Sequence, residues 1–280
     1  MKFAHPSSTL TMPDHAVAST AFERVTHLGI GAHPDDLEFM ALHGILECYG
    51  AADKWFGGVT CTDGRGSVRD GELSADALVA RRHAEQEEAA RIGEYSFIAQ
   101  LGYSSAEAKD ERDIRLTDDL HRILAAAQPK FVYTHNPADA HETHVAVMAR
   151  VVDAIRRLPM DNRPARVLGC EMWRDLDWLN IEDKVVLDVS SHPELSEKLT
   201  GLFNSQSEGG KRYDRAVLAR AESHATFLSS HNADRARAVW FAMDLTPLVV
   251  NEKMSLSQCV NGHISRFKKS VMDQLQRWEA

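Results

Sequence analysis

Short apolar runs alternate with longer amphipathic segments along most of this chain. The runs have the length of β-strands, and the segments between them have the length and polarity of helices. From this pattern we expect strands at residues 25–30, 55–61, 95–101, 130–134, 166–173 and 184–190. We expect helices at residues 37–49, 74–92, 117–127, 141–158, 193–204, 212–228 and 264–279.

The order of these elements predicts the fold class. Strands that alternate with helices of this length form βαβ units, and the strands of such units run parallel. We therefore expect an α/β protein with a Rossmann-like three-layer fold and a mainly parallel sheet. Without an internal repeat or a clear linker, we assign residues 25–280 to a single domain. Residues 1–24 are rich in Pro, Ser and Thr and predict a partly irregular N-terminal extension.

Composition excludes several kinds of partner. The formal net charge is −9 and no long Lys/Arg run occurs, so nucleic acid is not an expected partner. No secretory leader and no run of about 18 apolar residues is present, which argues against a membrane partner. The four cysteines form no C-x-x-C pair and fit buried thiols in a reducing compartment. We expect a cytoplasmic protein.

The stretch after the first expected strand is unusual for a loop. His33, Asp35 and Asp36 follow residues 25–30 directly. Two adjacent carboxylates repel each other, and burying them is costly unless a cation or hydrogen-bond donors compensate. The stretch is therefore either a solvated turn that caps the next helix, or part of a site that holds a positive charge.

A second polar group follows the expected strand at residues 130–134. His141 and His144 are three residues apart, so a helix that starts here places both on one face. Parallel strands present their carboxyl ends at one edge, where both groups would converge. A zinc ion could then be held by His33, Asp36 and one of the two later histidines. Asp35 would be free to act as a general base, and the remaining histidine could stabilise an oxyanion.

These residues resemble the PIG-L or LmbE-like family of N-acetylglucosaminyl deacetylases. The family signature is A-H-P-D-D-x-E after the first strand, followed by R-x-x-E and a later H-x-x-H. The matching segments here are residues 32–38 (AHPDDLE), 62–64 (TDG), 82–85 (RHAE) and 141–144 (HETH). The segments KVVLDVS at residues 184–190 and FNSQ at residues 203–206 resemble the bacillithiol-pathway branch.

The resemblance implies a zinc-dependent hydrolase that removes an N-acetyl group from a substrate containing N-acetylglucosamine or a related amino sugar. It assigns metal binding to three side chains, namely His33, Asp36 and His144. It makes Asp35 the general base and His141 the acid that stabilises the oxyanion. It places Arg82 against sugar hydroxyls, with Glu85 orienting Arg82 or serving as a solvated helix charge. Fe²⁺ or another divalent metal could replace zinc. Relatives in the bacillithiol branch also imply a homo-oligomer.

Other polar or aromatic residues have weaker assignments. Arg65 and Arg69 lie on a Gly-rich loop at the same edge and could bind a carboxylate or phosphate of the substrate. A solvated loop is the alternative. Residues 171–174 could line the site with an aromatic face or pack in the core. We expect His224 and His231 to lie on the surface or to cap helices.

Three departures from the family pattern concern the substrate more than the metal. Thr143 stands where the family has an acidic residue, residues 39–44 replace a glycine-rich stretch, and no acid follows residues 101–102 directly. The same site could therefore cleave a different acyl group or a thiol-conjugate amide. A non-catalytic sugar- or metal-binding protein is the other alternative, although the retained Asp35 argues against it.

Overall fold

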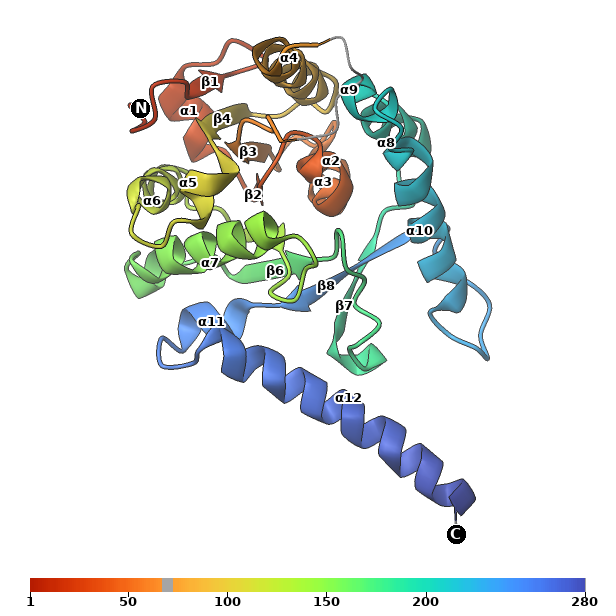
Figure 1. The fold of residues 1–280 in the computed structure, drawn as a ribbon. Coiled ribbons are helices and arrows are strands. Elements are labelled where there is room, and N and C mark those ends of the chain that lie inside the picture. Colours follow the sequence, from red (N-terminus) through yellow and green to blue (C-terminus); the bar gives the residue numbers. More distant parts are fainter. Residues whose placement is uncertain (67–72, 280) are drawn as a thin grey trace.

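Eight strands form one mixed sheet in the computed structural model, which describes residues 1–66 and 73–279 (Figure 1). The sheet order is β1-β4-β3-β2-β5-β6-β8-β7. The strands are β1 (Thr9–Thr11), β2 (His27–Gly31), β3 (Phe56–Thr62), β4 (Phe97–Tyr103), β5 (Phe131–His135), β6 (Arg166–Cys170), β7 (Lys184–Asp188) and β8 (Val239–Asp244). The five adjacent strands β4, β3, β2, β5 and β6 pair in parallel. The strands β1 and β8 pair antiparallel with their neighbours. The expected α/β class with a mainly parallel sheet is confirmed.

Helices cover the sheet on two sides and bury two apolar clusters. One cluster contains side chains from α1 (Ala18–Glu23), α5 (Ser105–Lys109), α6 (Arg115–Ala127), α7 (Glu142–Arg156) and α11 (Thr246–Val250). The other contains side chains from α2 (Asp36–Met40), α3 (Leu42–Cys48), α4 (Ala75–Ile92), α8 (Pro193–Thr200) and α10 (Tyr213–Phe227). The remaining helices are α9 (Asn204–Ser207), α12 (Leu256–Glu279) and the short 3₁₀ segments η1 (Met160–Asn162) and η2 (Ile181–Asp183). No helix in the described ranges is long and apolar enough to cross a bilayer.

Each expected strand is present, within a few residues of its predicted bounds. The helix expected at residues 37–49 is two helices, because the backbone leaves helical geometry at Ala41 (φ −105°, ψ 14°). The helix expected at residues 193–204 ends earlier, and α9 follows it separately. The strand β8 is missed by the sequence analysis. Its continuous apolar run is buried on both faces, and such a run shows no period that would separate strand from helix.

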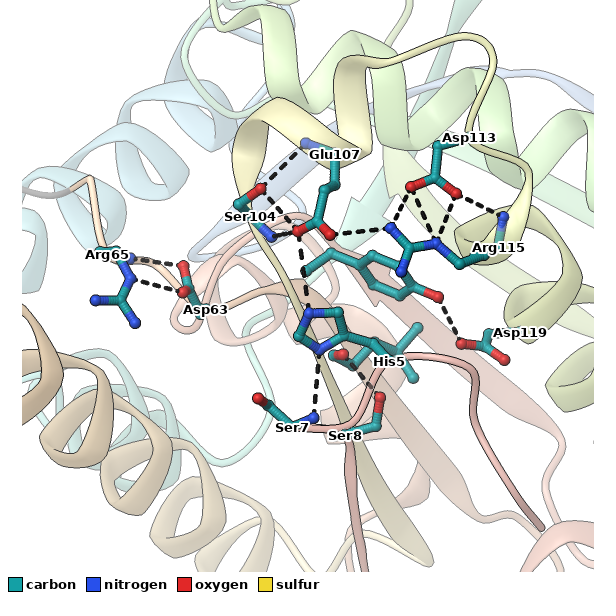
Figure 2. A network of polar contacts seen from close by, with 12 residues as sticks. His5, Ser7, Ser8, Asp63, Arg65, Ser104, Glu107, Asp113, Arg115 and Asp119 are labelled. Atoms are coloured by element: carbon teal, nitrogen blue, oxygen red, sulfur yellow. Dashed lines mark hydrogen bonds and ion pairs between the residues drawn. The ribbon is translucent and has the colours of Figure 1, made fainter.

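The N-terminal segment is more regular than expected. Within residues 1–24, β1 adds an antiparallel edge strand beside β4, and α1 packs into the first apolar cluster. Polar contacts fasten this segment to the body (Figure 2). The hydroxyl of Ser8 donates to the carbonyl of Leu101 at 2.8 Å, and His5 lies 4.0 Å from the carboxylate of Glu107. The assignment of one domain to residues 25–280 stays a prediction.

The first strand of the parallel set begins at a buried histidine. The His27 ring stacks on Phe131 with 4.7 Å between centroids, and its Nδ1 lies 2.9 Å from the hydroxyl of Thr26. Burial, followed by the charges of His43 and Lys54, lowers the pKa of His27 to about 4. The folded state therefore favours the neutral ring.

This histidine makes stability depend on pH. The unfolded chain protonates His27 near pH 6.5, whereas the folded chain resists protonation until about pH 4. Its contribution is therefore complete above pH 6.5 and is lost as pH falls toward 4, by about 2–3 kcal/mol. His27→Phe keeps a ring that can stack on Phe131 but removes the titrating group. We expect the free energy of unfolding of this variant, measured by urea titration, to decrease less between pH 7 and pH 4.5 than that of wild type. The exposed His231→Gln should behave as wild type, and equal losses in all three proteins would contradict the prediction.

Candidate active site

The site lies where the direction of strand addition reverses. From β2 the chain adds β3 and β4 on one side of the sheet, and β5 and β6 pair on the other side. The loops after β2 and β5 therefore open a crevice at the carboxyl edge, which is where ligands bind in sheets of this kind. A cavity of about 660 Å³ occupies this position. Its lining includes residues that follow β2, β3 and β5 and one from α4, among them His33, Asp35, Asp36, Gly64, Arg82 and His141.

Asp35 is held in a conformation that an L-residue rarely adopts. Its φ is 93°, and its backbone N–H donates to the side-chain oxygen of Gln86 at 3.1 Å. The amide of Gln86 donates in turn to Glu38 at 2.7 Å, and the hydroxyl of Tyr95 donates to the same carboxylate oxygen at 2.6 Å. The buried Glu38 therefore holds Gln86 and, through it, the Asp35 turn. Backbone strain of this kind persists only where surrounding contacts impose it.

Arg82 joins two of the three loops. Its side chain is 2% exposed and donates to the carbonyls of Pro34 at 2.6 Å and Gly64 at 3.0 Å. The same guanidinium lies 3.3 Å from a carboxylate oxygen of Asp35. Both terminal nitrogens are thus already engaged by the protein, although Arg82 still lines the cavity.

Three donor atoms converge next to Asp35. Nδ1 of His33 lies 3.1 Å from Nε2 of His144, and Oδ2 of Asp36 lies 3.4 Å and 3.6 Å from these two nitrogens. A tetrahedral centre with bonds of about 2.0–2.2 Å separates its ligand atoms by about 3.3–3.6 Å. The spacing of these atoms therefore fits a divalent ion such as zinc. His141 is also near, with its ring centroid 4.7 Å from that of His144.

A fourth histidine, His135, was missed by the sequence analysis. It ends β5, and its ring stacks on His144 with centroids 3.8 Å apart. Its Nε2 lies 3.3 Å from Asp36 but accepts the backbone N–H of Ala32 at 2.9 Å. An imidazole nitrogen has a single lone pair, so this hydrogen bond competes with metal binding by His135. Its position at the carboxyl end of a buried strand was the signal in the sequence.

The carboxylate that orients His144 is also not the expected one. Thr143 stands where the family that the sequence resembles has an acid, and the exposed Glu142 pairs with Lys109 at 3.3 Å at the edge of the cavity. Instead, Asp139 lies 3.5 Å from Nδ1 of His144 and accepts the backbone N–H groups of His141 at 2.8 Å and Trp173 at 3.1 Å. A carboxylate behind a ligating histidine fixes the orientation of the ring and raises its basicity. Asp139 thus supplies a carboxylate behind His144 from four residues before Thr143.

Burial and charge separate the two adjacent aspartates. Burial raises the pKa of Asp35 to about 8, although the nearby Arg82 opposes the shift. Burial also acts on Asp36, but the facing His144 and His135 outweigh it and hold its pKa well below the usual range. Burial lowers the pKa of His141, and the charges of His144 and His33 lower it further. Asp36 is therefore stabilised as an anion, whereas Asp35 has the higher pKa and is the one of the two that can exchange a proton near neutral pH.

Aromatic and basic side chains form the outer wall of the cavity. Trp173 is 44% exposed, its ring centroid lies 6.0 Å from that of Tyr213, and the ammonium of Lys211 lies 5.2 Å from the Trp173 ring. The suggestion that residues 171–174 contribute an aromatic face to the site therefore agrees with this placement. Gln206, from the FNSQ segment, lines the same cavity.

Several expected residues lie elsewhere. Arg65 pairs with Asp63 (Figure 2) and with Asp76, and it lines a smaller neighbouring pocket. Arg69 lies outside the described residues. Glu85 does not orient Arg82: its carboxylate accepts from the backbone and hydroxyl of Ser205 at 2.9 Å and 2.5 Å.

Two further sets of side chains differ from the sequence expectations. The apolar residues 39–42 are buried in the second cluster and do not line the cavity. His224 was expected at the surface or in a cap. It is instead largely buried, with Nδ1 3.0 Å from the buried carboxylate of Glu171. The exposed His231 does lie on the surface.

Comparisons with known proteins give a partial match to one family model and a likeness in fold to several solved structures. Residues 28–155 match the PIG-L family model, described as GlcNAc-PI de-N-acetylase. No curated protein matches the chain in sequence. The structure resembles N,N'-diacetylchitobiose deacetylase from Pyrococcus horikoshii at 18% identity and TM-score 0.65, covering 85% of this chain and 90% of that chain. The family match does not single out the bacillithiol-pathway branch.

Two other solved structures share the fold. The hydratase GalB from Pseudomonas putida KT2440, which acts on 4-carboxy-2-hydroxymuconate, has 18% identity and TM-score 0.58, covering 82% of this chain and 100% of its own. A zinc-inhibited form of the teicoplanin deacetylase Orf2 has 14% identity and TM-score 0.51, covering 79% and 98%. Because one fold carries both deacetylases and a hydratase, the reaction has to be argued from the site.

The role of Asp139 can be tested through metal affinity. We expect Asp139→Asn, which keeps an oxygen acceptor but removes the charge behind His144, to weaken zinc binding about 10–100-fold. Competition with a chromophoric chelator measures this affinity. Glu142→Gln removes an exposed carboxylate three residues away, which begins α7 and pairs with Lys109, and should bind zinc as wild type does. Equal affinity in Asp139→Asn and wild type would contradict the assignment.

Proposed function

We propose that this protein is a metal-dependent hydrolase that removes an N-acetyl group from an amino-sugar substrate, because residues 28–155 match the PIG-L family model. The substrate would contain N-acetylglucosamine or a related sugar. One observation carries the proposal: three donor atoms converge within 3.6 Å of one another beside Asp35, a carboxylate outside that set. Asp35 lines the same cavity as His33 and Asp36, and His144 is buried beside them.

His33, Asp36 and His144 would hold the metal ion. When bound, a divalent ion supplies Lewis-acid chemistry, in that it polarises a carbonyl oxygen and lowers the pKa of water. The zinc-inhibited form of a structural neighbour supports testing zinc first. Fe²⁺ is the second candidate, because histidine and carboxylate ligands accept both metals.

In its ionised form, which a rising pH favours because burial raises the pKa of Asp35 to about 8, Asp35 would take the proton from the attacking water. The carboxylate faces the cavity next to the ligand set, and Arg82 and Gln86 hold its turn in place. Removing this proton makes the water a stronger nucleophile toward the amide carbonyl. Arg82 would act mainly as a positioning residue, because its terminal nitrogens already donate to Pro34 and Gly64.

His141 would donate a hydrogen bond to the oxygen of the tetrahedral intermediate. Its ring meets His33 edge-on at the wall of the cavity, with 4.9 Å between centroids. Its Nδ1 has no hydrogen-bond partner among the described residues. A neutral imidazole still carries one N–H donor, so His141 can stabilise developing negative charge without being protonated beforehand. The products would be acetate and the free amino sugar.

Asp35→Asn tests the base. We expect this variant to retain the bound metal, because its ligands are unchanged, and to lose about 10²–10⁴-fold in kcat. The measurement is acetate release from a panel of N-acetylglucosamine conjugates, with metal content determined on the same preparations. Asparagine tolerates a positive φ, so the turn should survive the change. Turnover equal to wild type would exclude Asp35 as the base.

His144→Ala is the matched variant for the metal. It should lose most bound zinc and activity together, whereas Asp35→Asn should lose activity alone. Full zinc occupancy in His144→Ala would contradict the ligand set. Activity of wild type only on substrates with longer acyl groups, or on thiol-conjugate amides, would redirect the proposal to another deacylase.

The outer wall should act on substrate binding. Trp173 and Lys211 line the cavity and offer an aromatic face and a cation to the substrate, and the Trp173 ring stacks on His141 with 6.4 Å between centroids. We expect Trp173→Ala to raise KM about 10-fold while kcat changes little, since truncated aromatic contacts cost about 1–3 kcal/mol. Steady-state kinetics on the preferred conjugate measure the two constants. A fall in kcat with unchanged KM would show that Trp173 acts on the chemical step instead.

A further inference from the structure

The last helix, α12, projects away from the body of the protein (Figure 1). At its base, Arg266 donates to Asp183 of η2 at 2.9 Å and 3.0 Å. Beyond this contact the helix continues to Glu279, and none of the residues of α12 is buried. With 24 residues it is roughly 36 Å long. An isolated amphipathic helix of this length is marginal in water unless its apolar face is covered.

The apolar face of α12 is continuous and unusually regular. Ile264, Phe267, Val271, Leu275 and Trp278 follow one another at intervals of three, four, four and three residues. At 100° per residue, all five side chains fall within about 40° of the direction of Val271. Four of them are solvent-exposed, by 46% for Ile264, 37% for Val271, 48% for Leu275 and 89% for Trp278. We call these five residues the α12 stripe.

The spacing of the α12 stripe is the same read in either direction from Val271. A two-fold axis at Val271 therefore places Val271 against its own copy and Phe267 against Leu275. The same axis places Ile264 against Trp278, so that each layer joins two apolar side chains. A surface that matches itself under a two-fold axis is what an isologous interface requires. Side chains that repeat every three or four residues also fit the packing of paired helices.

The charges favour an antiparallel pair. The whole chain carries −9, whereas α12 contains four basic and only two acidic residues. In an antiparallel pair, the two acidic bodies lie at opposite ends of the helices. A parallel pair would bring the two like-charged bodies together at one end.

We propose that α12 is a dimerisation element that pairs antiparallel with the α12 of a second copy of this chain through the α12 stripe. The interface lies on the far side of the molecule from the cavity, so the proposal does not depend on the proposed function. It identifies the surface and the orientation of the pair, which the family resemblance does not.

The oligomeric state tests the proposal. Light scattering after size-exclusion chromatography of the full chain should give the mass of two chains at micromolar concentrations. Val271→Asp places a charge at the centre of the stripe and should raise the dimer Kd at least about 100-fold. Gln276→Asp introduces the same charge on the opposite face of the helix and should remain dimeric. Circular dichroism of both variants checks that the body stays folded.

Three outcomes would overturn the proposal. The first is a wild-type protein that is monomeric at about 50 μM, far above the range expected for a specific interface. The second is a mass other than that of two chains. The third is a Val271→Asp protein that dimerises as well as Gln276→Asp.

Cysteine cross-linking tests the orientation. In the antiparallel pair, Ile264 faces Trp278 of the other copy, so oxidation of a mixture of Ile264→Cys and Trp278→Cys chains should give a disulfide-linked heterodimer. Each variant alone should give little cross-linked product, as should wild type, whose cysteines are buried or half-buried. Efficient cross-linking of Ile264→Cys with itself would indicate a parallel pair and overturn the proposed orientation.

Discussion

The structure depends on how the protein holds two adjacent carboxylates at the end of its central strand. Asp35 and Asp36 are both buried, and burying two like charges side by side is costly unless each has its own compensation. The two carboxylates are compensated by different groups. Arg82 approaches Asp35 from α4, and the histidines after β2 and β5 face Asp36.

This arrangement ties the fold to the chemistry. Arg82 connects the loop after β2 to the loop after β3, and Asp36 connects the loop after β2 to the loop after β5. The contacts that offset the cost of burying the charges of Asp35 and Asp36 therefore also position the three loops around the cavity. Glu38 completes the support by holding Gln86, which fixes the Asp35 backbone at a positive φ. A preorganised carboxylate beside convergent ligands is what a hydrolytic site needs.

The far side of the molecule presents a different physical problem. There α12 leaves an apolar stripe in water, and its symmetric spacing suits a second copy of the same helix. The cavity and the stripe use separate parts of the chain. Dimerisation would therefore cover the helix without closing the entrance that Trp173 and Lys211 line.

Much of the site was predictable because adjacent residues in the sequence are adjacent in space within one turn. His33, Asp35 and Asp36 share a loop, and His141 and His144 share the start of a helix, so their grouping follows from spacing. That the two groups meet follows from parallel strands ending at one edge. The family motif pointed to Arg82 but not to its contact with Asp35, which joins residues far apart in the chain. The contact of Arg82 with sugar hydroxyls stays a prediction, and the structure adds that its terminal nitrogens donate to two carbonyls from separate loops.

By itself, the sequence determined the alternation of strands and helices, the edge of the sheet where polar loops gather, and the residue types that can bind a metal. These are properties of short segments and their periodicity. Only the tertiary structure decided that Asp139 rather than a neighbour of His144 stands behind that ring, and that His135 lies beneath it. It alone showed that Arg65 faces away and that Glu85 holds Ser205. Such contacts join residues far apart in the chain, and their partners are set by packing, which local pattern does not encode.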